Sequence, residues 1–152
     1  MSGFKIYSKS ILIPVAIGGV VGLIISNFMD YGSLEKPILA PPGIAFPIIW
    51  TILYILMGIS YGILESNSNI DCNVNLIYYS QLFLNALWPI FFFVFKWRLF
   101  SFIWLLLLVF LVLLMVIRFY LKDTKAGILQ IPYLLWTIFA SYLNLFTYIL
   151  NK

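Results

Sequence analysis

The sequence predicts an all-α integral membrane bundle of five transmembrane helices. Hydrophobic residues make up 64% of the 152 residues and charged residues only 9%, whereas a soluble domain has about 45–50% and about 25%. Five apolar blocks of about 18–24 residues fill most of the chain, and each can cross about 30 Å of hydrocarbon as a helix. The leucine run 105–108 lacks the alternation of membrane β-strands. We therefore expect one multi-pass domain over residues 1–152.

The predicted helices follow the apolar blocks in order. The first block is too long for a signal-peptide core and no cleavage site follows it, so we expect a retained helix. Its residues Gly18, Gly22 and Ser26 share one face, where another helix can approach closely. Pro41 and Pro42 open the second block, as suits the first turn of a helix. The predicted ranges are residues 10–28, 43–64, 76–95, 100–117 and 127–150.

The fourth block is the most uniformly apolar. Its middle holds no polar group except the indole of Trp104, so we expect it to form a lipid-facing wall. An odd number of spans places the two termini on opposite sides of the membrane. The basic residues divide five against four between the two sides, which leaves the orientation open.

Composition also narrows the chemistry. The chain has no histidine and one cysteine, Cys72, which excludes a disulfide within the chain, histidine-ligated metals and Ser–His or Cys–His catalysis. We expect no metal site. The basic residues behind the net charge of +4 are spread along the chain, so nucleic-acid binding is not expected. No acidic residue interrupts an apolar block, which argues against a proton pump or an ion-coupled transporter.

Three blocks carry aromatic and amide residues at helical spacing. Two interpretations remain open: these faces pack against each other with the asparagines bonding across the bundle, or they enclose a flat-walled cavity for a planar, hydrophobic ligand. The residues are Phe46, Trp50 and Tyr54 in the second block, Asn85, Trp88 and Phe92 in the third, and Tyr133, Trp136, Ala140 and Asn144 in the fifth.

The carboxyl-terminal segment has the spacing of a weak cholesterol-contact pattern. Leu145, Tyr148 and Lys152 are its three positions. An interfacial tyrosine followed by a lysine that reaches toward the headgroups explains the same residues.

Several of these segments resemble the TspO/MBR family, which includes tryptophan-rich sensory proteins and the mitochondrial translocator protein. The resemblance rests on the segments 31–43, 46–58, 84–92 and 132–144, in order and with the family's spacing. It implies a five-helix bundle, a homodimer, and a pocket covered by the loop between the first two helices. The family usually has a tryptophan in the stretch that here reads Ile38-Leu39-Ala40, so one aromatic contact of that lid is missing.

The resemblance also implies a function. It assigns the ten aromatic, amide and alanine residues named above to a ligand site in the lipid-embedded part of the chain. The implied ligands are porphyrins, sterols and benzodiazepine-type drugs, bound without a cofactor by a receptor or sensor that could also transport or sequester them. We expect this protein in a bacterial cell membrane, with lipid as its other partner. The alternatives are light- and oxygen-dependent porphyrin breakdown that uses Trp50 and Trp136, and a scaffold without a ligand.

Overall fold

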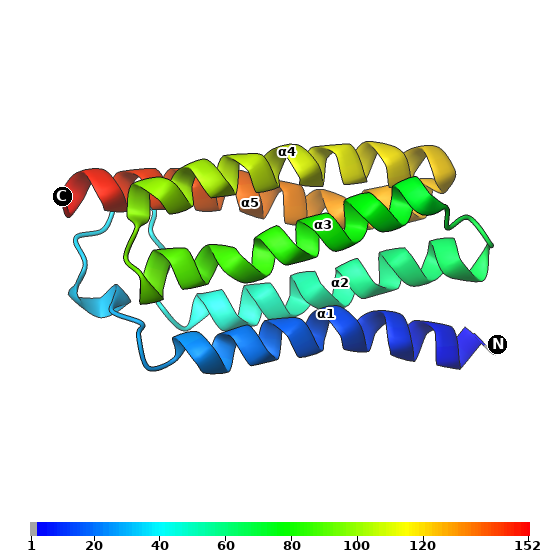
Figure 1. Ribbon diagram of the computed structural model, residues 1–152, viewed down its shortest axis with the longest axis horizontal. Helices are drawn as coiled ribbons and strands as arrows, with labels where there is room; N and C mark the ends of the chain where they lie inside the picture. The colour runs from blue at the N-terminus through cyan, green and yellow to red at the C-terminus, as the bar shows by residue number, and fades with distance from the viewer. Residues whose placement is uncertain (1–2) are drawn as a thin grey trace.

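Five long helices run side by side through residues 3–152, the part of the chain that the computed structural model describes (Figure 1). The all-α membrane fold is thereby confirmed, because each of these helices is long and apolar enough to cross a membrane. The N-terminus lies at one end of the bundle and the C-terminus at the other. The helices are α1 Gly3–Ile25, α2 Ala45–Ser66, α3 Cys72–Pro89, α4 Arg98–Lys122 and α5 Thr124–Leu150, with a 3₁₀ turn η1 at Tyr31–Ser33 and a π-helical turn η2 at Ile90–Val94.

Two helices begin earlier than their predicted ranges because a capping side chain, rather than hydropathy, determines the start. The Asp71 carboxylate accepts a hydrogen bond from the backbone N–H of Val74 at 2.8 Å, so α3 begins at Cys72 rather than residue 76. Asp123 accepts from Lys125 N–H at 2.9 Å and begins α5 in the same way. An acidic side chain at this position satisfies N–H groups that have no partner within the helix.

Small residues let α1 approach α2. A Cβ atom at Gly58 would lie 2.4 Å from the Ile11 Cα atom, and one at Gly18 would lie 2.3 Å from the Tyr54 ring. These glycines therefore serve contacts within the bundle. The expected close approach at Gly22 does not occur: a Cβ there would meet nothing within 4 Å in the described chain. Ser26 lies beyond the end of α1, where its hydroxyl donates to the Leu23 carbonyl.

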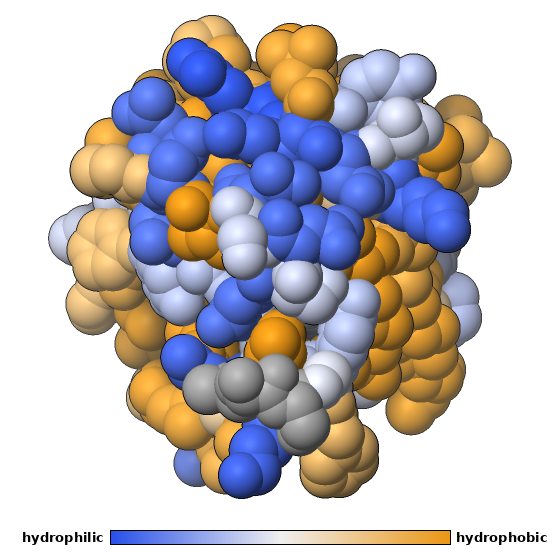
Figure 2. All heavy atoms as spheres, turned by 90° about the vertical axis from the view of Figure 1, so that its right-hand side faces the viewer, coloured by the Kyte–Doolittle hydropathy of each residue, from blue (hydrophilic) through white to orange (hydrophobic). Residues whose placement is uncertain are grey.

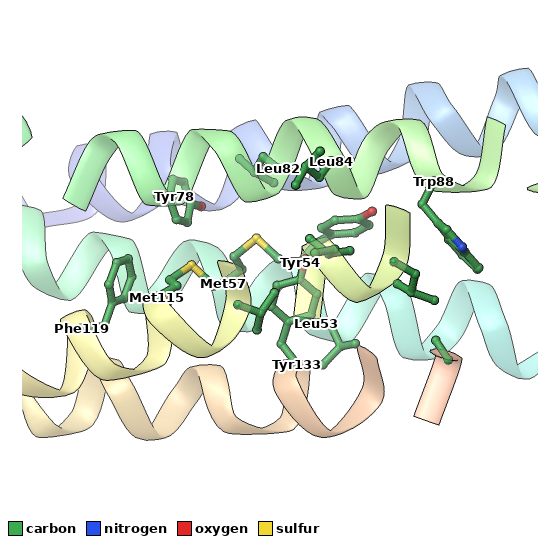
Figure 3. Close-up of a cluster of buried hydrophobic side chains, with 14 of the residues drawn as sticks. Leu53, Tyr54, Met57, Tyr78, Leu82, Leu84, Trp88, Met115, Phe119 and Tyr133 are labelled. Carbon is green, nitrogen blue, oxygen red and sulfur yellow. The ribbon is translucent and has the colours of Figure 1, made fainter. Parts of the chain in front are cut away.

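The expectation that the fourth span forms only a lipid-facing wall is wrong for one of its faces. Leu105, Leu108, Met115 and Phe119 of α4 are completely buried, and α4 packs closely against α5 and α3. Figure 3 shows Met115 and Phe119 in the hydrophobic core together with Met57 of α2. The opposite face, with Leu106 and its neighbours, is exposed as expected of a lipid-facing surface. A helix that is apolar all round gives no sequence signal for which face is buried.

Polar side chains gather at the ends of the bundle. The end that faces the viewer in Figure 2 carries a hydrophilic surface surrounded by apolar flanks. On it, Lys122 and Asp71 form an ion pair of 2.7 Å between α4 and the start of α3. The hydrogen bond from Lys122 lowers the pKa of the Asp71 carboxyl below its ordinary value of 3.8.

Candidate ligand cavity

A largely apolar cavity of about 390 Å³ opens inside the bundle near the loop between α1 and α2. Its volume falls within the range of about 300–1,000 Å³ that small-molecule sites occupy. Side chains from α1, α2, α3, η2 and α5 line it. Eight of the ten predicted ligand residues border it: Phe46, Trp50, Tyr54, Asn85, Trp88, Phe92, Ala140 and Asn144.

The two other predicted residues lie behind the wall. Tyr133 is 1% exposed and belongs to the core, and Figure 3 shows it in the same cluster as Tyr54. The Trp136 ring stands 6.4 Å from Trp50 and 6.0 Å from Phe46, measured between ring centroids. Both residues thus support side chains that border the cavity.

The sequence prediction missed α1 as part of the wall. Val15, Gly18, Gly19, Gly22 and Ile25 all border the cavity. This helix carries neither aromatic nor amide groups on that face, so the pattern that identified the other helices does not occur in it. The four-residue spacing of Gly18 and Gly22 was the available signal, but it indicated close packing rather than open space.

Asn85 is held by a buried chain of hydrogen bonds. The Tyr54 hydroxyl donates to Asn85 Oδ1 at 2.6 Å, and Asn85 Nδ2 donates to the Tyr133 hydroxyl at 2.6 Å. Tyr133 in turn donates to Gln81 Oε1 at 2.7 Å. These bonds join α2, α3 and α5 at one level. The interpretation that Asn85 bonds across the bundle is therefore confirmed.

Asn144 of α5 also bonds across the bundle, to residues of α3 and α4. Its Oδ1 accepts from Trp88 Nε1 at 2.8 Å and from the Ser101 hydroxyl at 3.1 Å. Its Nδ2 donates to the Arg98 carbonyl at 2.9 Å. Ser101 is fully buried, and the Trp104 indole of α4 donates to the Leu84 carbonyl of α3 at 2.8 Å. Polar groups of α4 thus take part in the interhelical bonds, which the sequence prediction did not anticipate.

The cavity walls therefore present aromatic faces rather than free hydrogen-bonding groups. Trp50 is central among them, with ring centroids of Tyr54 at 5.7 Å and Trp88 at 6.4 Å. The ring centroids of Trp88 and Phe92 are 5.7 Å apart. Such walls favour a flat ligand, because ring faces stack on planar π systems.

The segment between α1 and α2 covers the cavity at its end. Met29 and Tyr31 of this segment border the cavity, and burial raises the pKa of the Tyr31 phenol. The Asn151 side chain holds the segment from the end of α5, since its Oδ1 accepts from Glu35 N–H at 2.9 Å and its Nδ2 donates to the Glu35 carbonyl at 2.8 Å. Tyr142 of α5 also donates to the Ile38 carbonyl.

The stretch Ile38-Leu39-Ala40, where the resemblance led us to expect a tryptophan, lies outside the cavity lining. The Ile38 and Leu39 side chains are 82% and 76% exposed, and Leu39 has a φ of 75°. The three residues of the carboxyl-terminal pattern also lie outside the cavity lining: Leu145 and Tyr148 are half-buried and Lys152 is exposed.

Fold and cavity together define a class: a multi-pass helical membrane protein with an aromatic-walled internal pocket. Comparison with known proteins gives the family. The profile of the TspO/MBR family matches residues 10–149. The chain belongs to the TspO/MBR family.

Similar proteins occur in distant organisms. The chain is 37% identical to the tryptophan-rich protein TspO of Archaeoglobus fulgidus over 145 residues, which cover 93% of this chain and 94% of that protein. It is 34% identical to protein CrtK of Rhodobacter capsulatus, with 91% and 89% covered. It is 32% identical to the translocator protein homolog of Schizosaccharomyces pombe, with 92% and 88% covered. The family and the five apolar helices establish an integral, multi-pass membrane protein.

Proposed function

We propose that this protein is a membrane receptor or sensor that binds planar, hydrophobic small molecules, with a porphyrin as the ligand. The observation that carries the proposal is that the amide groups of the cavity wall are bonded within the protein, while its aromatic rings are available to a ligand. The amide groups of Asn85 and Asn144 form hydrogen bonds with other residues of the protein. Trp50, Trp88 and Phe92 border the cavity. Recognition in such a site depends on shape and stacking.

Direct titration tests this function. Protoporphyrin IX is added to the purified protein in lipid nanodiscs, and the absorbance change of the bound porphyrin gives the dissociation constant. We expect saturable binding that Trp50→Leu weakens by about two- to tenfold, because an aromatic pair contributes about 0.5–1.5 kcal/mol beyond its buried area. Trp136→Leu, behind the wall, should weaken it less.

Trp97→Leu is the matched control, because Trp97 is 54% exposed and lies outside the cavity lining. Equal losses for Trp50→Leu and Trp97→Leu would mean that the porphyrin associates with the protein surface. Non-saturable uptake by every variant would mean partition into the lipid, and either result would refute the proposed site.

Porphyrin breakdown is the second candidate. It is favoured by the contact between Trp50, which borders the cavity, and Trp136 behind it. Illumination of the complex in air should then give a new chromophore at a rate that falls in both variants. Bleaching at the rate of protein-free porphyrin would exclude it. The homodimer, the bacterial cell membrane and contact with sterols remain predictions.

A further inference from the structure

An ionic cluster of Asp30, Lys96 and Arg98 lies just outside the cavity lining, beside the lining residues Met29, Tyr31 and Phe92. The Asp30 carboxylate stands 3.0 Å from Nη2 of Arg98 and 3.6 Å from Nζ of Lys96. Arg98 is the more buried of the two cations, with 14% of its side chain exposed against 57% for Lys96. One carboxylate thus faces two cations. The cluster has a net positive charge.

The pairing of Arg98 with Asp30 is incomplete. Among residues 3–152, neither Nε of Arg98 nor Oδ1 of Asp30 has a hydrogen-bond partner, although both atoms are buried. Guanidinium groups bind carboxylates best in a two-point arrangement that uses two N–H groups. A buried charged group that lacks a partner costs free energy. Arg98 therefore keeps an unused donor in a place that water does not reach.

Arg98 also lies next to the cavity wall. Its guanidinium carbon is 5.4 Å from the centroid of the Phe92 ring, and its carbonyl accepts the hydrogen bond from Asn144. Phe92 and Asn144 both border the cavity. On the other side of the ion pair, Met29 and Tyr31, the sequence neighbours of Asp30, border the cavity as well. The pair thus lies directly behind lining residues at the end of the cavity that the loop covers.

The Asp30 side chain is not tied to its own turn. Asp30 directly precedes η1, but its carboxylate makes no capping hydrogen bond to that turn within the described chain. The hydrogen bonds from the Ser33 N–H and hydroxyl go to the Asp30 carbonyl instead. A competing carboxylate can therefore displace the side chain without breaking the turn.

We propose that Arg98 is the anchor for an acidic group of the ligand, and that Asp30 occupies Arg98 when the cavity is empty. The ligand class is an amphiphile with a flat apolar body and a carboxylate at one edge. Its body fills the aromatic cavity while its carboxylate takes both the bonded and the unused donors of Arg98. This inference rests on the proposed function, and it specifies the charge that the ligand carries.

Comparison of protoporphyrin IX with its dimethyl ester in the unmodified protein tests the anchor. The ester keeps the flat ring and lacks the negative charge. We expect the acid to bind at least about tenfold more tightly than the ester, because hydrogen bonds between charged partners are stronger than those between neutral groups. Equal affinity of acid and ester would overturn the anchor and leave the proposed function intact. Absence of saturable binding by either porphyrin would refute the function, and the anchor with it.

Two variants and one control variant then identify which residue binds the acidic group. Arg98→Gln should remove the preference for the acid, while Arg118→Gln, an exposed arginine at the other end of the same helix, should leave it unchanged. Asp30→Asn should increase the affinity for the acid severalfold and leave that for the ester unchanged, because it removes the competing carboxylate. A loss of acid binding in Asp30→Asn like that in Arg98→Gln would mean that the pair only holds the loop, and would overturn the proposal.

Discussion

Disruption of the Tyr54–Asn85–Tyr133 chain should destabilise the bundle and spare ligand binding. Asn85→Leu keeps the size of the side chain and removes two hydrogen bonds of 2.6 Å, one with Tyr54 and one with Tyr133. Tyr133 keeps its bond to Gln81, so the Tyr54 hydroxyl is the donor left without its acceptor.

The magnitude follows from the number of bonds. An interhelical hydrogen bond in a membrane protein contributes about 0.6 kcal/mol on average and about 1.7 kcal/mol at most. Asn85→Leu should therefore cost about 1–3 kcal/mol of unfolding free energy, and Tyr54→Phe, which removes one bond, about half of that. The double variant loses the same two bonds as Asn85→Leu but has no orphaned hydroxyl, so its cost should not exceed that of Asn85→Leu alone.

The unmodified protein, the two single variants and the double variant are unfolded in mixed micelles of a mild and a denaturing detergent. The unfolding curves give the free energy of unfolding of each protein. We expect a coupling between the two sites about equal to the cost of Tyr54→Phe. Affinity for protoporphyrin should stay within about twofold in Asn85→Leu, since both the oxygen and the nitrogen of the Asn85 amide already bond to tyrosines of the protein. Additive costs would refute the hydrogen-bond chain, and a large loss of affinity would show that Asn85 binds the ligand directly.

Three further predictions concern packing, charge and the loop. Gly58→Ala should cost about 1–3 kcal/mol because its Cβ meets the backbone of α1, whereas Gly19→Ala, with open space around its Cβ in the described chain, should be neutral in the same unfolding assay. The pKa of Asp71 is lowered because Lys122 donates a hydrogen bond to its carboxylate. Its contribution to stability is therefore complete above pH 3.8 and is lost as the pH falls through the lowered pKa. The variant Asp71→Asn should be less stable than the unmodified protein at pH 7 and should lack this acid-induced loss of stability. Asn151→Ala removes both bonds to the loop and should accelerate porphyrin dissociation in stopped-flow measurements, and an unchanged rate would mean that the loop does not cover the path of release.

The sequence predicted the spans well because lipid imposes a strong constraint on composition. The ends of the helices escaped prediction where a cap was decisive, as at Asp71 and Asp123. Each of these aspartates stands outside the apolar block that defined its span. Hydropathy identifies the part of a helix inside hydrocarbon, while local hydrogen bonds determine where the helix begins.

The site was partly predictable for a similar reason. Helical spacing placed Trp50, Trp88 and Asn144 on faces that converge, and they border the cavity. The same spacing also selected Tyr133, which is buried behind the wall, because periodicity identifies a face and not the depth of a residue in the bundle. Gly22 was missed because a residue without a side chain marks open space as readily as close contact.

Filling of the cavity tests the central claim most directly. Gly22→Leu places a large side chain at a position that borders the cavity, where an added Cβ atom would meet nothing within 4 Å in the described chain. Ala16→Leu adds a side chain on an exposed part of the same helix, outside the cavity lining. Titration of both folded variants with protoporphyrin should show binding lost or weakened more than tenfold in Gly22→Leu and unchanged in Ala16→Leu. Unchanged binding in Gly22→Leu would contradict the account, because the porphyrin would then bind elsewhere than in this cavity.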